Sequence, residues 1–231
     1  MAEKPSNVDQ WLKRETPQIR QALESASRYF DANDSLTVNT REAVYGRESS
    51  FGTMLRERGS VVPAGHFHFK PDTAKEYGLN ISKNNDQRFD IDYASSAAAR
   101  YLKDLDNRFR EDTKTIIGVR NSLERQKFIL AAYNGGPNRI ADAQQRAKQA
   151  GTDPKLWINV EKFLVSEDTS LSKADEIRQY VERVLSDQAE FAAKSPADKT
   201  IKHKEPPRKG EYRCTEGHWV TIDDRPVYIC D

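Results

Sequence analysis

The spacing of apolar residues constrains this chain more than any other feature, because they recur every three or four positions along most of the sequence. That period matches one face of an α-helix. Residues 95–109 show it clearly, with Ala98, Leu102, Leu105 and Phe109 on one face. The same spacing predicts helices over residues 8–30 with a break at Pro17, then 40–50, 138–149, 157–164 and 177–185, with Thr40 and Asn138 as N-caps. Residues 122–133 are apolar throughout and predict a central, buried helix. The sequence therefore predicts a mainly α fold.

One stretch, between Phe51 and Asp92, breaks the helical pattern. Glycine and proline punctuate it at six positions, which are Gly52, Gly59, Pro63, Gly65, Pro71 and Gly78. A loop-rich insert of this length is uncommon in a helical domain, and such loops often carry function. We therefore expect this insert to contribute to a functional site.

The composition limits the classes of protein to which the chain can belong. Charged residues make up 32% of it, and the longest apolar run, residues 128–133, is far below the roughly 18 residues that a membrane-spanning helix needs. Lysine and arginine number 37 against 36 aspartate and glutamate residues. We therefore expect no membrane insertion and no general binding of nucleic acid, although residues 194–209 form a local basic stretch.

The C-terminal part differs from the rest in composition. Residues 194–213 combine basic residues with prolines and predict a flexible linker, and residues 212–214, 219–222 and 227–230 predict short strands. Both cysteines of the chain, Cys214 and Cys230, lie here, and we expect a disulfide that pins a β-hairpin. Metal ligation with His203 or His218 is the alternative. The predicted organisation is a helical segment over 1–37 packed on the main domain, the main domain over 38–191, a linker over 192–211 and a tail over 212–231.

A first candidate for chemistry is Glu48, which lies near the end of a predicted helix and just before the irregular insert. A carboxyl group at the mouth of a cleft would be half-buried. Burial raises the pKa of a carboxyl and keeps it protonated near neutral pH, which suits a general acid. A solvated glutamate on a helix is the alternative, and it describes most glutamates.

Two further segments carry polar groups that suit a ligand. At the end of the helix over residues 122–133, the Tyr133 hydroxyl is suited to hydrogen-bond a catalytic carboxyl, and the Asn134 amide to bind sugar hydroxyls or an acetamido group. In residues 64–74, His66 and His68 alternate with phenylalanines. A metal site there lacks a recognisable ligand pattern, so we expect a cleft wall with His68 facing the ligand.

Taken together and in this order, these segments resemble the lytic transglycosylases of the soluble (SLT) type, which belong to glycoside hydrolase family 23 and are related to goose-type lysozymes. The family pattern is Glu-Ser, then Gly-x-x-Gln leading into Pro-x-Thr-Ala, then Ala-Tyr-Asn-x-Gly. Its elements correspond here to Glu48-Ser49, to Gly65 with Pro71, Thr73 and Ala74, and to Ala132-Tyr133-Asn134-Gly135-Gly136. His68 stands where the family usually carries Gln. The resemblance covers roughly residues 38–188 and not the tail.

The resemblance implies a lysozyme-like helical domain that cleaves the β-1,4 bond between N-acetylmuramic acid and N-acetylglucosamine and leaves 1,6-anhydromuramoyl ends. It implies Glu48 as general acid and base, with Ser49, Gly65, His68, Tyr133 and Asn134 binding substrate, and no metal or cofactor. Two alternatives stay open. One is a hydrolytic lysozyme with Glu57 or Asp72 as second carboxylate, and the other is a binding module that holds peptidoglycan without cutting it.

The same resemblance implies the partner and the compartment. The partner is the glycan strand of peptidoglycan, and we expect a monomer, while any inhibitor or immunity protein is left open. The N-terminus lacks the pattern of a secretory signal. Action in the periplasm or on the cell wall would then need a phage-type route, a secretion system, or a signal segment that has been trimmed away.

Overall fold

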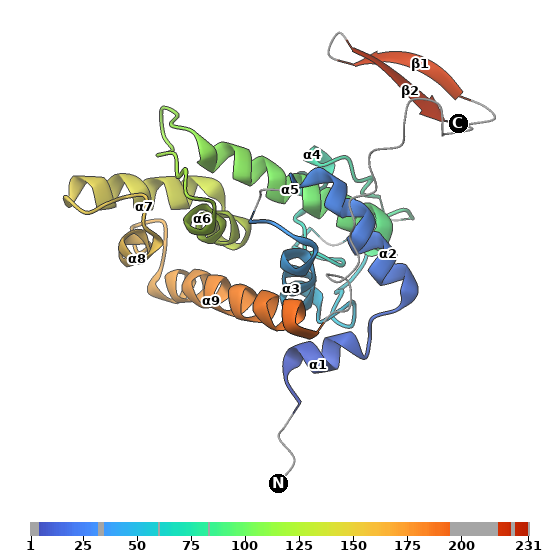
Figure 1. Ribbon diagram of the computed structural model, residues 1–231, viewed down its shortest axis with the longest axis horizontal. Helices are drawn as coiled ribbons and strands as arrows, with labels where there is room; N and C mark the ends of the chain where they lie inside the picture. The colour runs from blue at the N-terminus through green and yellow to red at the C-terminus, as the bar shows by residue number, and fades with distance from the viewer. Residues whose placement is uncertain are drawn as a thin grey trace. The chain divides into compact units, whose positions relative to one another are not determined.

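The structure is a computed structural model that describes residues 5–31, 35–59, 61–82, 84–194, 217–222 and 225–230, the last two ranges by their backbone. The chain divides into two compact units, Met1–Lys194 and Ser195–Asp231. The first unit is helical, as the apolar spacing predicts (Figure 1). Its elements are α1 (Asn7–Leu12), α2 (Pro17–Ser25), η1 (Ala26–Tyr29), α3 (Val38–Ser49), α4 (Pro71–Glu76), η2 (Gln87–Phe89), α5 (Ile91–Arg110), α6 (Ser122–Gly135), α7 (Pro137–Gln149), α8 (Trp157–Val160), η3 (Glu161–Phe163) and α9 (Leu171–Lys194).

The starts of the helices follow local chemistry. Pro17 marks a break, as predicted, and it is also the first residue of α2. The missing N–H of proline is harmless at that position, and Thr16 caps the N-terminus of the helix. Two predicted caps are wrong. Thr37 caps α3 and Thr40 lies one turn inside it, where the two side chains complete a capping box. Asn138 lies in the first turn of α7, which begins at Pro137 after Gly136.

Helix α6 forms the centre of the first unit, in contact with α5, α7 and α9 (Figure 1). Its middle is buried on all sides, since Phe128, Ile129, Leu130, Ala131 and Ala132 are fully covered. A helix that is apolar around its whole circumference belongs in a core. The helix ends at Gly135, where Gly136 adopts a positive φ of 87°, and this stop leaves Tyr133 and Asn134 near a helix end.

The insert between α3 and α5 is held by a buried ion pair. Arg88 and Asp86 are both fully buried, and Nη2 of Arg88 lies 2.7 Å from Oδ2 of Asp86. Arg88 also donates to the carbonyls of Val62 (3.2 Å) and Phe69 (3.1 Å), and its own carbonyl accepts the N–H of His66 at 2.8 Å. One buried guanidinium therefore ties together a segment that has almost no regular structure.

The second unit contains an antiparallel pair of strands, β1 (Gly217–Ile222) and β2 (Arg225–Cys230), in which Val220 pairs with Val227. This agrees with the predicted hairpin. Residues 212–214 lie outside the described residues, so the disulfide between Cys214 and Cys230 stays a prediction. Within the part of the chain that the structure describes, every helix is too short or too polar to cross a membrane.

Candidate active site

A cleft of about 600 Å³ in the first unit collects most of the predicted site residues. It is formed where the end of α3, the insert, the junction between α6 and α7, and the start of α9 meet. Its lining consists of Glu48, Arg56, Pro63, Phe67, His68, Phe69, Lys70, Thr73, Tyr101, Tyr133, Asn134, Gly135, Gly136, Pro137, Arg139, Lys173 and Glu176. The loop-rich insert thus supplies one wall, as the sequence predicts.

Glu48 projects from the last turn of α3 with its side chain only 15% exposed. The hydroxyl of Tyr180, on α9, donates a hydrogen bond of 2.7 Å to its Oε1. Burial raises the pKa of Glu48 to about 7, while the Tyr180 hydrogen bond and the cations Lys173 and Arg56 act in the opposite direction. A carboxyl with this pKa holds its proton up to neutral pH and can return to the ionised form, which a group that serves as both acid and base requires.

His68 faces Glu48 from the insert. Its Nε2 lies 2.8 Å from the carbonyl of Met54, and because a carbonyl only accepts, Nε2 carries the proton. In the neutral ring Nδ1 is then the acceptor, and it lies 3.6 Å from Oε2 of Glu48. Burial lowers the pKa of His68, although the bond to Met54 opposes this. The neutral imidazole therefore stands beside a protonated carboxyl.

The hydroxyl of Tyr133 does not make the hydrogen bond that the sequence predicts. It donates to the carbonyl of Phe67 at 3.1 Å rather than to the carboxyl of Glu48. The ring instead stacks on Tyr180, with centroids 6.4 Å apart and planes 7° from parallel, and it contacts the ring of Tyr101 at 5.3 Å. Tyr133 therefore forms an aromatic wall beside Glu48, and Tyr180 makes the hydrogen bond that the sequence assigned to Tyr133.

Asn134 lines the cleft with its amide held on both sides. Its Nδ2 donates to Glu176 at 3.1 Å, and its Oδ1 accepts from Nζ of Lys173 at 3.1 Å. Lys173 also lies 2.8 Å from Oε1 of Glu176. These three side chains form a network that orients the amide at the cleft wall, and Lys173 balances the negative charge of Glu176.

Two predicted site residues do not line the cleft. Ser49 is fully buried, and its hydroxyl accepts the N–H of Gly52 at 3.2 Å, so it stabilises the turn after α3. Gly65 adopts a positive φ of 80°, and a Cβ on it would meet the carbonyl oxygen of Arg88 at 2.1 Å. This close approach requires glycine. Both residues therefore shape the backbone around the site, and neither offers a side chain to the cleft.

The alternative chemistries draw on other side chains. Glu57 and Asp72 are exposed and are not among the cleft residues, where the carboxylates are Glu48 and Glu176. Nδ1 of His66 lies 2.9 Å from the Tyr45 hydroxyl, and His66 is not among the cleft residues. Over the described ranges, no group of three or more His, Cys, Asp and Glu side chains is arranged to hold a metal ion.

The sequence does not point to four residues of the site, namely Lys173, Glu176 and Arg139, which line the cleft, and Tyr180, which hydrogen-bonds Glu48. Tyr180 lies on the buried face of α9 and is 9% exposed, and its hydroxyl reaches Glu48. A tyrosine on an otherwise aliphatic helix face is the signal, because a buried hydroxyl needs a partner.

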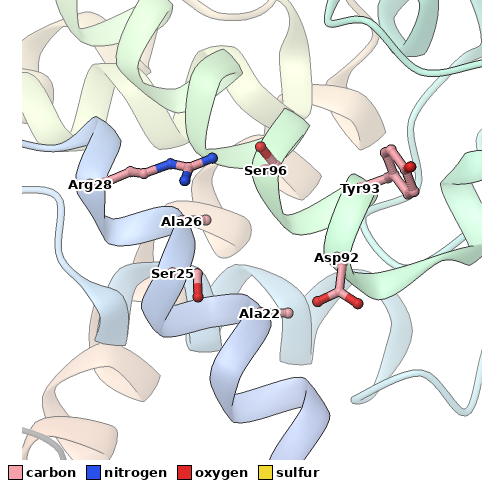
Figure 2. A pocket seen from close by; sticks show the side chains of 7 residues that line it. All are labelled: Ala22, Ser25, Ala26, Arg28, Asp92, Tyr93 and Ser96. Atoms are coloured by element: carbon pink, nitrogen blue, oxygen red, sulfur yellow. The ribbon is translucent and has the colours of Figure 1, made fainter. Parts of the chain in front are cut away.

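A second hollow, of about 280 Å³, lies between α2 with η1 and the start of α5. Figure 2 shows Ala22, Ser25, Ala26 and Arg28 on one helical segment and Asp92, Tyr93 and Ser96 on the other. The hydroxyl of Ser96 lies 3.1 Å from that of Tyr29, and Asp92 accepts from Gln18 at 3.3 Å. None of the predicted site residues lines this hollow, so the cleft at Glu48 is the candidate active site.

Comparison with known proteins agrees with this geometry. The family model described as the transglycosylase SLT domain matches residues 31–156, more than half of the chain. The match contains Glu48, His68, Tyr133 and Asn134, and it ends before α9, which carries Tyr180, Lys173 and Glu176.

Curated relatives point the same way. A membrane-bound lytic murein transglycosylase F from Desulfosudis oleivorans is 31% identical over 153 residues, which is 62% of this chain and 30% of that protein. One named membrane-bound lytic murein transglycosylase F from Shewanella loihica is 32% identical over 92 residues, covering 40% of this chain and 17% of its own length. The membrane-bound lytic murein transglycosylase D of Escherichia coli K12 is 27% identical over 123 residues, covering 53% and 22%. The chain thus spans less than a third of the length of these relatives.

Proposed function

The chain belongs to the transglycosylase SLT domain family, and we propose that it is a peptidoglycan lytic transglycosylase. It cleaves the β-1,4 bond between N-acetylmuramic acid and N-acetylglucosamine and leaves 1,6-anhydromuramoyl ends, with Glu48 as general acid and base. The observation that carries the proposal is the buried carboxyl of Glu48 in the cleft, with a pKa raised to about 7 and a hydrogen bond from Tyr180.

The first half of the reaction breaks the glycosidic bond. Glu48 transfers its proton to the oxygen that links the two sugars, and the bond from that oxygen to the anomeric carbon of the muramoyl sugar breaks. The acetamido oxygen of the same sugar attacks the anomeric carbon and takes up the positive charge. A neighbouring group of the substrate thus replaces the enzymic nucleophile, so one catalytic carboxylate suffices.

The second half closes the anhydro ring. Glu48, now ionised, takes the proton of the 6-hydroxyl of the muramoyl sugar, whose oxygen attacks the anomeric carbon and displaces the acetamido oxygen. Glu48 is protonated again at the end. The attacking hydroxyl belongs to the same sugar, and such an intramolecular nucleophile has a high effective concentration.

The other residues of the cleft take supporting roles in this proposal. Asn134, held by Lys173 and Glu176, binds polar groups of the sugar, and His68 accepts a hydrogen bond at Nδ1 close to Glu48. The rings of Tyr133 and Tyr101 offer flat apolar surfaces to sugar rings. Ser49 and Gly65 contribute through the backbone, and no cofactor enters the reaction.

Besides Glu48, Glu176 is the cleft carboxylate that could serve a hydrolytic mechanism as second carboxylate. Its hydrogen bonds with Lys173 and Asn134 lower its pKa, although burial opposes this, so it is a weak base for activating water. This favours the anhydro product over hydrolysis. We further propose that the protein acts on the cell wall as a monomer.

Release of soluble fragments from purified peptidoglycan tests the proposal. The wild-type protein should release them, and Glu48→Gln should bind peptidoglycan without releasing them, because the amide keeps the shape of the carboxyl but has no acidic proton. A wild-type protein that binds peptidoglycan and releases nothing would instead be a binding module.

A further inference from the structure

The turn that follows Glu48 has an unusual backbone. Ser50 and Phe51 both adopt positive φ angles, of 51° and 56°, and Gly52 follows at 79°. The left-handed region is unfavourable for residues other than glycine, and two such residues in a row persist only where the surroundings hold them. Something outside the turn must therefore stabilise it.

Trp11, on α1, supplies one part of that support. Its Nε1 donates to the hydroxyl of Ser50 at 3.1 Å, and its ring stacks on Phe51 with centroids 6.1 Å apart and planes 10° from parallel. Gly46 makes room for the indole, because a Cβ at that position would lie 2.5 Å from the ring. The indole therefore sits against the last turn of the helix that carries Glu48.

Arg14 supplies the other part. Its Nη1 donates to the carbonyl of Ser50 at 3.0 Å, to the Ser50 hydroxyl at 3.0 Å and to the hydroxyl of Thr53 at 3.4 Å. The carbonyl of Ser50 also accepts from the Thr53 hydroxyl at 3.0 Å. A single guanidinium thus binds both ends of the turn.

The same turn reaches both Glu48 and His68. The N–H groups of Thr53 and Met54 donate to the carbonyl of Ser49 at 3.0 and 2.9 Å, directly after Glu48. The carbonyl of Met54 then accepts the Nε2 proton of His68. A shift of this turn would move the end of α3 and the partner of His68 together.

The segment that holds the turn is itself anchored to the end of α9. Lys194 lies 2.6 Å from Oδ1 of Asp9, and Ser6 hydrogen-bonds Glu190. Trp11 also stacks on Phe191, with centroids 6.2 Å apart. All of these N-terminal residues precede residue 31, where the family match begins.

We propose that Trp11 and Arg14 are positioning residues for the reaction: the N-terminal segment holds the left-handed turn at Ser50–Gly52 and thereby fixes the carboxyl of Glu48 and the imidazole of His68 in the cleft. The inference rests on the proposed function, since it assigns these residues to the reaction of Glu48. We therefore expect catalysis to depend on two residues, Trp11 and Arg14, that do not line the cleft.

The test compares Arg14→Ala with Arg14→Lys and with Lys13→Ala, an exposed neighbour, as matched control. Trp11→Phe is a second variant that keeps an aromatic ring and removes the N–H donor. Each variant is assayed for kcat and KM on soluble peptidoglycan strands and for its thermal midpoint. The side-chain carboxyl of Glu48 is titrated by carbon NMR, with its signal assigned by comparison with Glu48→Gln.

We expect Arg14→Ala to lower kcat roughly tenfold with little change in KM, because small displacements of a catalytic group are costly. The pKa of Glu48 should move down toward its ordinary value as the loosened site admits water. Arg14→Lys should recover part of the loss, since one ammonium can still bind the Ser50 carbonyl. Trp11→Phe should also lower kcat and the pKa of Glu48, and Lys13→Ala should change neither.

Wild-type kcat and an unchanged Glu48 titration in both Arg14→Ala and Trp11→Phe would overturn the inference. A loss of kcat that follows the thermal midpoint, with the titration of Glu48 unchanged, would also overturn it, because the role would then be structural only. If the wild-type protein leaves the strands uncut, the proposed function fails, and the NMR titration still decides whether the segment positions Glu48.

Discussion

The hydroxyl of Tyr180 lies 2.7 Å from Oε1 of Glu48 and donates to it, joining α9 to the last turn of α3. The ring of Tyr180 is buried and stacked on Tyr133, so the donor has a fixed direction. Tyr180 lies beyond the residues that the family model matches. The environment of the proposed catalytic acid is thus completed by a helix outside that match.

Removing this hydroxyl should change the acidity of Glu48. The Tyr180 hydrogen bond stabilises the ionised carboxylate and so opposes the effect of burial. In Tyr180→Phe the pKa of Glu48 should rise, and the fall in rate on the alkaline side should move to higher pH. A rate profile over pH 5–9 measures this shift (~1 unit or less). Tyr133→Phe is the matched control, because its hydroxyl bonds to Phe67, and it should leave the alkaline side in place.

The wild-type rate should itself decline on the alkaline side with a midpoint near the pKa of Glu48. Burial raises this pKa to about 7, and the protonated form is the acid that starts the reaction, so activity should be lost as pH rises through about 7. Initial rates of fragment release at saturating substrate report the group in the complex. A rate that stays constant up to pH 9 would contradict Glu48 as the acid.

His68→Gln should keep the protein active and extend its activity to lower pH. Burial lowers the pKa of His68, so the ring is neutral at pH 7 and becomes cationic only in more acidic solution. The cation would then stand 3.6 Å from Glu48 and favour the ionised carboxylate, which cannot donate a proton. The ratio of the rates at pH 5 and pH 7 should therefore be higher in His68→Gln than in the wild type.

His66→Gln serves as the control for this prediction, because it removes an imidazole that bonds to Tyr45 outside the cleft. It should leave the shape of the pH profile unchanged. A loss of activity in His68→Gln as large as that in Glu48→Gln would show instead that His68 takes part directly in the reaction.

Glu48→Gln should stabilise the protein in alkaline solution. The pKa of Glu48 is raised from 4.5 to about 7 on folding, so the native state holds a proton that the unfolded state releases between these values. The free energy of unfolding of the wild type therefore falls as pH rises from 4.5 to about 7, and it does not recover above that pH. The variant carries no charge there and should be more stable than the wild type by roughly 3 kcal/mol at pH 8, with little difference at pH 4.

Urea unfolding of both proteins at the two pH values measures this effect. Glu57→Gln removes an exposed carboxylate and should show no such dependence. An equal stability difference between wild type and Glu48→Gln at pH 4 and pH 8 would mean that the carboxyl is not buried in the folded protein.

Much of the fold could be read from the sequence because packing gives helices a period. The core face of α5 follows directly from that spacing, α6 is recognisable because it is apolar throughout, and the glycines at the end of α6 mark where it stops. The sequence alone does not decide the N-cap of α3, since Thr37 and Thr40 are both suitable residues; in the structure Thr37 is the cap and Thr40 completes the capping box from one turn inside the helix. The hairpin strands were also recognisable from two short runs rich in β-branched and aromatic residues.

The site could be predicted only where motif residues carry it. Glu48, His68 and Asn134 come from the three segments, but the partners of Glu48 and Asn134 are distant in sequence: Tyr180 for Glu48, and Lys173 with Glu176 for Asn134. No local pattern encodes such contacts, because they depend on how α9 packs across α3 and α6. The motif alone assigns Ser49 and Gly65 to the substrate, although their contacts with Gly52 and Arg88 give them backbone roles.

The most direct test of the account is mass spectrometry of the fragments that the protein releases from purified peptidoglycan, with Glu48→Gln as control. We expect fragments that end in 1,6-anhydromuramic acid, each lighter by one water than the hydrolytic product and without a reducing end, and no release by the variant. Fragments with reducing ends would show that water attacks instead of the 6-hydroxyl. Undiminished release of either product by Glu48→Gln would contradict the central role of that carboxyl.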